Sequence, residues 1–151
     1  MTPKLTHTNP KILASGEGES HQLLTHTVVW KITTEDTNSR YAMFEMTDTV
    51  GGSAPAHKHP WEETFYILEG ELDIQIGDRY ETIGAGAVAH FPANMVHAFK
   101  IVSPVARVLI VVSPTIAEAF YREAGARITS FPPDPIVVQE LCEKYNLQPQ
   151  S

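Results

Sequence analysis

Three histidines and one carboxylate near the middle of the chain have the residue types of a metal site. His57 and His59 are separated by one residue, so their imidazoles share one face of an extended strand. Glu63 follows shortly after them, and His97 lies on a separate predicted strand beyond a glycine-rich turn. Three neutral imidazoles and a carboxylate form a mixed nitrogen and oxygen ligand set that suits a divalent transition metal. We therefore predict one such ion per chain, with Fe, Mn, Ni, Cu and Zn all compatible.

Glu62 competes with Glu63 for the carboxylate position. Glu63 has the same sequence parity as the two neighbouring histidines, which would place it on their face of a continuous strand. Pro60 and Trp61 interrupt that strand, so parity does not carry across strictly. On the residues alone, both glutamates stay candidates.

Several apolar side chains lie close in sequence to the predicted ligands. They are Phe65, Phe91, Met95 and Phe99. Such residues could line a pocket for an aromatic or hydrophobic small molecule, although a small barrel also needs apolar side chains to fill its interior. Phe65 has the parity of Glu63, which favours the inside, whereas Tyr66 is expected on the opposite face.

The elements that must hold these side chains are short strands. From residue 22 to 113, apolar runs alternate with turn residues at intervals of roughly 8 to 12, which is typical of an all-β sandwich or barrel. The clearest hairpin joins residues 72–76 to 80–83 through Gly77-Asp78. Further strands are expected over 23–33, 41–47, 88–91, 98–102 and 108–112. The last of these is apolar on both faces, so we expect a helix or a second subunit to cover its outer side.

After the strands the pattern changes to helices. Ser113 and Pro114 are suited to the start of a helix running to about residue 123, and Gly125 is suited to its end. Asp134 begins a second helix, whose apolar stripe is Val137, Val138, Leu141, Cys142 and Tyr145. Because Cys142 is the only cysteine, an intrachain disulfide and a cysteine-rich zinc site are excluded.

Composition and charge argue against some classes of binding partner. The chain has 151 residues with a formal net charge of −7 spread along its length, which argues against a nucleic-acid surface. Residues 1–20 contain no apolar run suited to a signal peptide or membrane anchor. We expect a cytoplasmic protein with no membrane partner. Its predicted parts are an N-terminal extension over 1–20, the strands over 21–113 and a helical tail over 114–151.

The spacing of the metal-site residues resembles the two conserved motifs of the cupin superfamily. The first run is Gly51, five residues, His57-Lys58-His59, three residues, Glu63, six residues and Gly70. The second run is Gly86, five residues, Pro92-Ala93-Asn94, two residues and His97. Asn94 stands where the family usually has glycine, and Ile101 where it often has asparagine. Residues 120–146 also resemble the helical tail of single-domain bacterial cupins related to quercetin dioxygenase, although less specifically than the two motifs do.

This resemblance implies a small antiparallel jelly-roll β-barrel with two short C-terminal helices, commonly as a homodimer. It selects Glu63 over Glu62 as the fourth ligand beside His57, His59 and His97. It also implies a second task for Glu63, as the base that accepts a proton from the substrate.

The function expected from the resemblance is a metal-dependent, dioxygenase-like enzyme acting on a small organic substrate, with aromatic molecules among the candidates. Two alternatives stay open. One is a non-catalytic cupin that binds or senses a small molecule, and the other is a sugar isomerase or epimerase.

Overall fold

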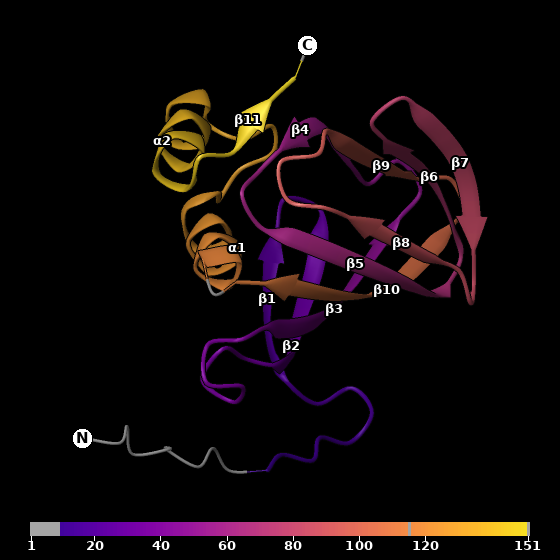
Figure 1. Ribbon diagram of the computed structural model, residues 1–151, viewed down its shortest axis with the longest axis vertical. Coiled ribbons are helices and arrows are strands. Elements are labelled where there is room, and N and C mark those ends of the chain that lie inside the picture. Colours follow the sequence, from indigo (N-terminus) through magenta and orange to yellow (C-terminus); the bar gives the residue numbers. More distant parts are fainter. Residues whose placement is uncertain (1–9, 115, 151) are drawn as a thin grey trace.

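Two antiparallel sheets face each other across a shared apolar core (Figure 1). The computed structural model describes residues 10–114 and 116–150. Sheet A has the strand order β1 (Glu19–Leu23), β2 (His26–Ile32), β3 (Ala42–Thr49), β10 (Val105–Ser113), β5 (Glu62–Glu69) and β8 (Val88–Phe91). Sheet B has the order β11 (Gln148–Pro149), β4 (Ser53–Lys58), β9 (His97–Ile101), β6 (Glu71–Ile76) and β7 (Arg79–Gly84). The all-β jelly-roll expected from the sequence is confirmed, as a two-sheet sandwich.

Alternation along the strands builds the core. In β10, which lies in the middle of sheet A, Ala106, Val108, Ile110 and Val112 are all buried. Leu109 and Val111 point the other way and are only partly buried. The expected cover on the outer side of this strand, a second subunit of a homodimer, stays a prediction.

The predicted hairpin between β6 and β7 is confirmed, with Gly77 at a positive φ of 57° in the turn. The strand expected over residues 23–33 is confirmed as β2, which pairs with β3, but its predicted start is wrong. The chain turns sharply at Leu24, which has a φ of 56°, so that β1 is a separate strand that pairs with β2. Leucine has no preference for turns, and the residue type therefore does not predict this one.

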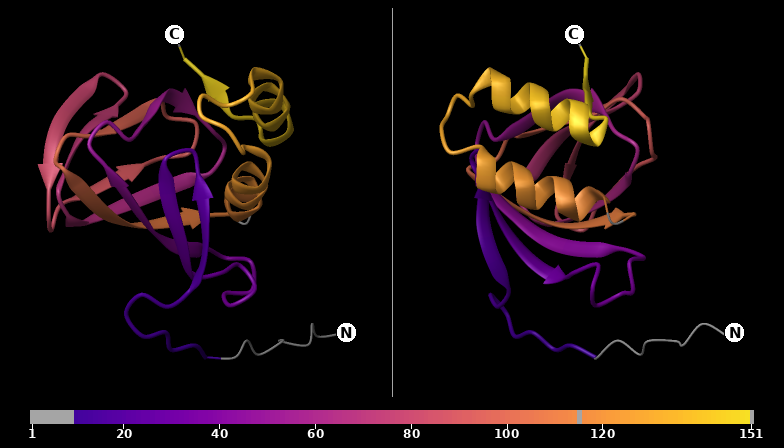
Figure 2. Two further views of the ribbon diagram at one scale, coloured as in Figure 1. Left: turned by 180° about the vertical axis from the view of Figure 1, so that it is seen from behind. Right: turned by 90° about the vertical axis from the view of Figure 1, so that its left-hand side faces the viewer.

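Two helices pack against one side of the sandwich, as the two views in Figure 2 show. They are α1 (Ile116–Arg127) and α2 (Pro135–Tyr145). The start of α2 is as predicted, because the Asp134 side chain accepts a hydrogen bond from the Ile136 N–H. No helix within residues 10–114 and 116–150 is both long and apolar enough to cross a membrane.

The predicted bounds of α1 are wrong at both ends. Ser113 belongs to β10, and its hydroxyl donates to the Arg40 carbonyl at 2.8 Å rather than capping a helix. Gly125 lies inside α1, where a Cβ would approach the His21 ring to 2.4 Å and the Gln22 carbonyl oxygen to 2.8 Å. The glycine is thus required for close packing of the helix on β1, and it does not end the helix.

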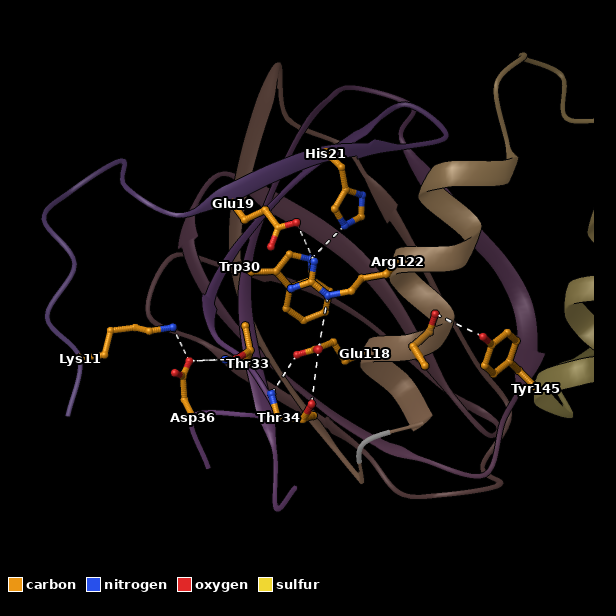
Figure 3. Close-up of polar contacts among 11 residues, drawn as sticks. Lys11, Glu19, His21, Trp30, Thr33, Thr34, Asp36, Glu118, Arg122 and Tyr145 are labelled. Atoms are coloured by element: carbon orange, nitrogen blue, oxygen red, sulfur yellow. Dashed lines mark hydrogen bonds and ion pairs between the residues drawn. The ribbon is translucent and has the colours of Figure 1, made fainter. Parts of the chain in front are cut away.

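Polar contacts attach α1 to the first hairpin (Figure 3). Arg122 lies 2.9 Å from a Glu19 carboxylate oxygen, and its guanidinium is 4.9 Å from the centre of a Trp30 ring. Glu118, one turn earlier, accepts a hydrogen bond from the Thr34 N–H at 2.9 Å. The inner face of α1 is thereby held over the end of the sandwich where β4 ends and β5 begins.

Candidate metal centre

The three predicted histidine ligands converge at that end of the sandwich. His57 is the second-last residue of β4, His59 directly follows that strand, and His97 is the first residue of β9. The antiparallel pairing of β4 with β9 places His57 opposite His97. One ring nitrogen of each histidine lies within 4.8 Å of the others. A single ion can therefore contact all three imidazoles.

Backbone carbonyls orient each imidazole in the same way. The Nδ1 atoms of His57, His59 and His97 lie 2.7, 2.9 and 2.9 Å from carbonyl oxygens two residues away in sequence. A carbonyl oxygen only accepts hydrogen bonds, so each Nδ1 carries the proton in the neutral ring. This tautomer leaves the Nε2 lone pairs free to bind a metal.

Two of these Nε2 atoms have no hydrogen-bond partner although they are fully buried. They belong to His59 and His97, whose exposed fractions are 2% and 1%. The nearest carboxylate oxygens, both of Glu63, lie 3.4 Å from His59 Nε2 and 3.6 Å from His97 Nε2, too far for good hydrogen bonds. Buried acceptors without donors are costly, and a cation bound between them would satisfy both. The donor set thus fits a transition metal.

Glu63 lies beside the histidines, whereas Glu62 is exposed on the opposite face of β5. Burial alone would raise the pKa of the Glu63 carboxyl, but the interactions with His59 and His97 outweigh it and hold that pKa well below its usual value. The carboxylate is therefore ionised at neutral pH.

Charge and burial act differently on the three imidazoles. Burial, together with repulsion from His97, lowers the pKa of His57 to about 4. Burial would also lower the pKa of His97, but the adjacent Glu63 raises it above the ordinary value. His57 is consequently neutral at pH 7 and available as a ligand.

The loop before β9 supports the same group. Asn94, which occupies the position where cupins usually have glycine, has a φ of 62°, a conformation that asparagine adopts more readily than most residues. Its N–H donates to the His59 carbonyl oxygen at 2.8 Å. The departure from the motif therefore preserves the turn.

Two side chains that the sequence did not assign to the site contact Glu63 directly. Trp61 is fully buried, stacks on the His59 ring with centroids 4.0 Å apart, and donates its Nε1–H to Glu63 Oε1 at 3.1 Å. The Tyr121 hydroxyl of α1 donates to the same oxygen. Burial, with the nearby Glu63 charge, raises the pKa of Tyr121 well above its usual value, which keeps this donor protonated.

The sequence contained a signal for only one of them. Trp61 lies within the histidine motif, between His59 and Glu63, which it contacts. Tyr121 is 58 residues away from Glu63, and only the packing of α1 brings the two together.

The predicted pocket residues divide into two groups. Phe65, Phe91 and Phe99 are buried, and the Phe65 ring lies 4.9 Å from Phe91 and 5.5 Å from Phe99. Phe91 also borders the metal ligands, with its ring centre 4.6 Å from that of His97. The Met95 side chain is 40% exposed, while its carbonyl orients His97. Phe91 therefore packs beside the histidines as part of the apolar core, and the lining of a pocket by these residues stays a prediction.

Residues 44–113 match the family model described as Cupin domain, and this range covers most of β3 and all of β4 to β10, with all four predicted ligands. The motif resemblance seen in the sequence is thereby confirmed.

The chain is similar to known proteins with several different activities. It is 29% identical over 119 residues to quercetin 2,3-dioxygenase of Bacillus subtilis, a match that covers 77% of this chain and 35% of that protein. The polyketide cyclase RemF from Streptomyces resistomycificus is 27% identical, with a TM-score of 0.60 over 71% of this chain and 80% of RemF. A predicted oxalate decarboxylase from Thermotoga maritima shares the fold, with 19% identity and a TM-score of 0.64. The match covers 69% of this chain and 99% of that protein.

Proposed function

We propose that this cupin is a metal-dependent, dioxygenase-like enzyme acting on a small aromatic substrate. The observation that carries the proposal is the convergence of three imidazoles with two unpartnered Nε2 atoms beside an ionised carboxylate. Similarity to quercetin 2,3-dioxygenase supports the reaction class.

His57, His59 and His97 would hold one divalent transition metal, with Glu63 as the fourth ligand. When bound, such an ion supplies Lewis acidity that polarises an oxygen of the substrate. Fe, Mn, Ni, Cu and Zn all accept this donor set.

Glu63 has a second task in the proposal, as the group that accepts a proton from a substrate hydroxyl. It is the only buried carboxylate near the three histidines in the described part of the chain, and it is ionised before the substrate arrives. Trp61 and Tyr121 hold its position while the proton moves.

The surroundings of the site favour an aromatic substrate without multiple negative charges. The polar or charged residues buried within 10–114 and 116–150 are His26, Asp48, His59, Glu63 and His97. This set contains no lysine or arginine that could bind a phosphate, which weighs against a phosphorylated sugar. The wall next to His97 is formed by Phe91 and Phe65.

A second candidate is a metal-assisted cyclase for an aromatic or polyketide-like substrate. The 27% identity to the polyketide cyclase RemF over 71% of this chain favours it over sugar isomerisation. The two candidates differ in whether dioxygen is consumed. A cupin that binds such a molecule without turnover is the third outcome.

The test begins with the metal content of the purified chain, followed by oxygen uptake and product analysis with quercetin as the probe. We expect about one metal per chain and oxygen consumption. Glu63→Gln should lower kcat by at least about 100-fold, since general base catalysis contributes this much, while retaining most of the metal.

The matched control is Glu62→Gln, which removes the neighbouring charge from the exposed face of the same strand. It should keep the wild-type kcat. Product formation from a polyketide probe without oxygen uptake would support the cyclase, and saturable binding without turnover would support the binding protein. A chain that takes up none of the five metals would overturn the proposal.

A further inference from the structure

Glu63 Oε1 receives two hydrogen bonds from different parts of the fold. Trp61 Nε1, at the start of β5, donates to it at 3.1 Å, and the Tyr121 hydroxyl of α1 donates to the same atom. Oε2 accepts no hydrogen bond from the described residues and lies 3.6 Å from His97 Nε2. The two oxygens of one carboxylate thus have different surroundings.

The number of lone pairs on each carboxylate oxygen decides which oxygen of Glu63 is free to bind a metal. A carboxylate oxygen has about two acceptor sites in the carboxylate plane. The two donors therefore use the acceptor capacity of Oε1, whereas the capacity of Oε2 remains free. A metal held by the three histidines would find one available oxygen on Glu63.

We propose that Tyr121 is a positioning residue which, together with Trp61, makes Glu63 a one-oxygen ligand through Oε2. The inference rests on the metal site of the proposed function. It extends that site to α1, an element outside the residues 44–113 matched by the cupin model.

Packing keeps the Tyr121 hydroxyl in place. Its ring lies 4.9 Å from the Phe44 ring and 6.4 Å from the Trp30 ring, and both of these neighbours are buried. Arg122, the next residue, covers Trp30 from the outside. The side chain is therefore supported by sheet A as well as by its own helix, and a small shift of α1 would alter the donors around Glu63.

The chain offers a matched control in Tyr145. Its hydroxyl also donates to a carboxylate, Glu123 Oε1 at 3.0 Å, and this pair joins α2 to α1 (Figure 3). Tyr145→Phe removes a tyrosine-to-glutamate hydrogen bond of the same kind. Any difference between Tyr121→Phe and Tyr145→Phe then reports on the metal site rather than on helix packing.

The experiment uses the full chain loaded with Co²⁺, whose visible absorption depends on ligand number and geometry. Infrared difference spectra between the cobalt-loaded and metal-free protein report the carboxylate stretches, whose separation is larger for one-oxygen than for two-oxygen binding. In the wild type we expect the large separation. In Tyr121→Phe we expect a smaller separation of the carboxylate stretches and a changed visible spectrum of the bound Co²⁺. The Kd for Co²⁺ should differ about tenfold from that of the wild type.

A double-mutant cycle on the metal-free protein tests the contact itself. The losses of Tm in Tyr121→Phe and Glu63→Ala should not add in the double variant, because each substitution removes the same hydrogen bond. Tyr145→Phe combined with Glu63→Ala should be additive.

The outcomes separate the two proposals. Unchanged cobalt and infrared spectra in Tyr121→Phe, with wild-type metal loading, would overturn the positioning role and leave the metal site standing. Additive losses in the metal-free cycle would overturn it as well. A wild-type chain that binds neither Co²⁺ nor any of the five metals named above would overturn the proposed function and, with it, this inference.

Discussion

The core of this protein contains two buried groups of histidine and carboxylate, and only one of them has the form of a metal site. His26 on β2 lies with its Nδ1 2.7 Å from an oxygen of Asp48 on β3. Asp48 also accepts hydrogen bonds from the Thr25 hydroxyl at 2.6 Å and the Thr49 N–H at 2.7 Å. Phe99 connects the two groups, since its ring lies 5.7 Å from His26 and it follows His97 by two residues in β9.

The difference lies in where the polar atoms point. In the pair of His26 and Asp48, one imidazole and the local donors surround a single carboxylate, so its charge is satisfied within the pair. At the other group, three imidazoles present Nε2 atoms to a common point and two of these atoms have no donor. Burial of histidine and carboxylate is therefore a poor indicator of a metal site, and convergence of unpartnered ligand atoms is a better one.

Removing one converging ligand should have the largest effect. In His97→Ala we expect metal affinity to fall by more than about 100-fold, because even changes outside the ligand sphere cost 10 to 100-fold. His26→Gln alters an equally buried histidine and should keep the wild-type metal content. Mass spectrometry of metals after dialysis measures both, and equal losses in the two variants would mean that the comparison is wrong.

Breaking the second group should affect stability instead. Asp48→Ala removes the carboxylate beside the buried His26 and the acceptor of the Thr25 hydroxyl, so the free energy of unfolding should fall by about 2 kcal/mol. Urea unfolding of the metal-free protein gives this value. Exchanging both partners, as in the His26→Leu and Asp48→Ala double variant, should recover part of the loss. A loss well below 1 kcal/mol would show that the pair contributes little.

The pH dependence of stability should also detect the buried His26, in the same pH range as His57, whose pKa is lowered to about 4. Burial lowers the pKa of His26 below 6.5 and outweighs the opposing effect of Asp48. Between pH 6.5 and the lower native pKa, His26 is protonated in the unfolded chain but stays neutral in the native state. Stability should therefore decrease as the pH falls through this window, with up to about 1.4 kcal/mol per pH unit from this histidine.

His26→Gln should make the pH profile flatter below 6.5 and leave it unchanged above. Urea midpoints at pH 7.5, 6.5 and 5.5 suffice for the comparison. An unchanged slope in the variant would assign the acid sensitivity to other residues.

Much of the fold and the ligand set could be predicted because the relevant information is local. Strand alternation predicted the hairpin of β6 and β7, and the two-residue spacing of His57 and His59 predicted that their imidazoles meet. The choice of Glu63 came from the resemblance to the cupin motif. These patterns follow from the two-residue period of a strand and need no knowledge of distant contacts.

The features that were wrong or missing depend on tertiary packing. Gly125 has the residue type of a helix end, but close approach to β1 accounts for it. The turn at Leu24 is made by a residue with no turn preference. The sequence of α1 does not mark Tyr121 as a site residue, because only the packing of α1 brings its hydroxyl to Glu63. Each depends on an element distant in sequence, which propensity and periodicity do not report.

The pairing of β11 with β4 also bears on the order in which the site is completed during synthesis. Gln148 and Pro149 pair with Lys58 and His57, and the Gln150 N–H donates to the Ala56 carbonyl oxygen at 2.8 Å. These partners leave the ribosome about 90 residues after His57, which corresponds to roughly 5 to 20 s at ordinary elongation rates. Until then the strand that carries His57 has a partner on one side only. Metal loading is therefore expected to follow translation of the barrel strands rather than accompany it.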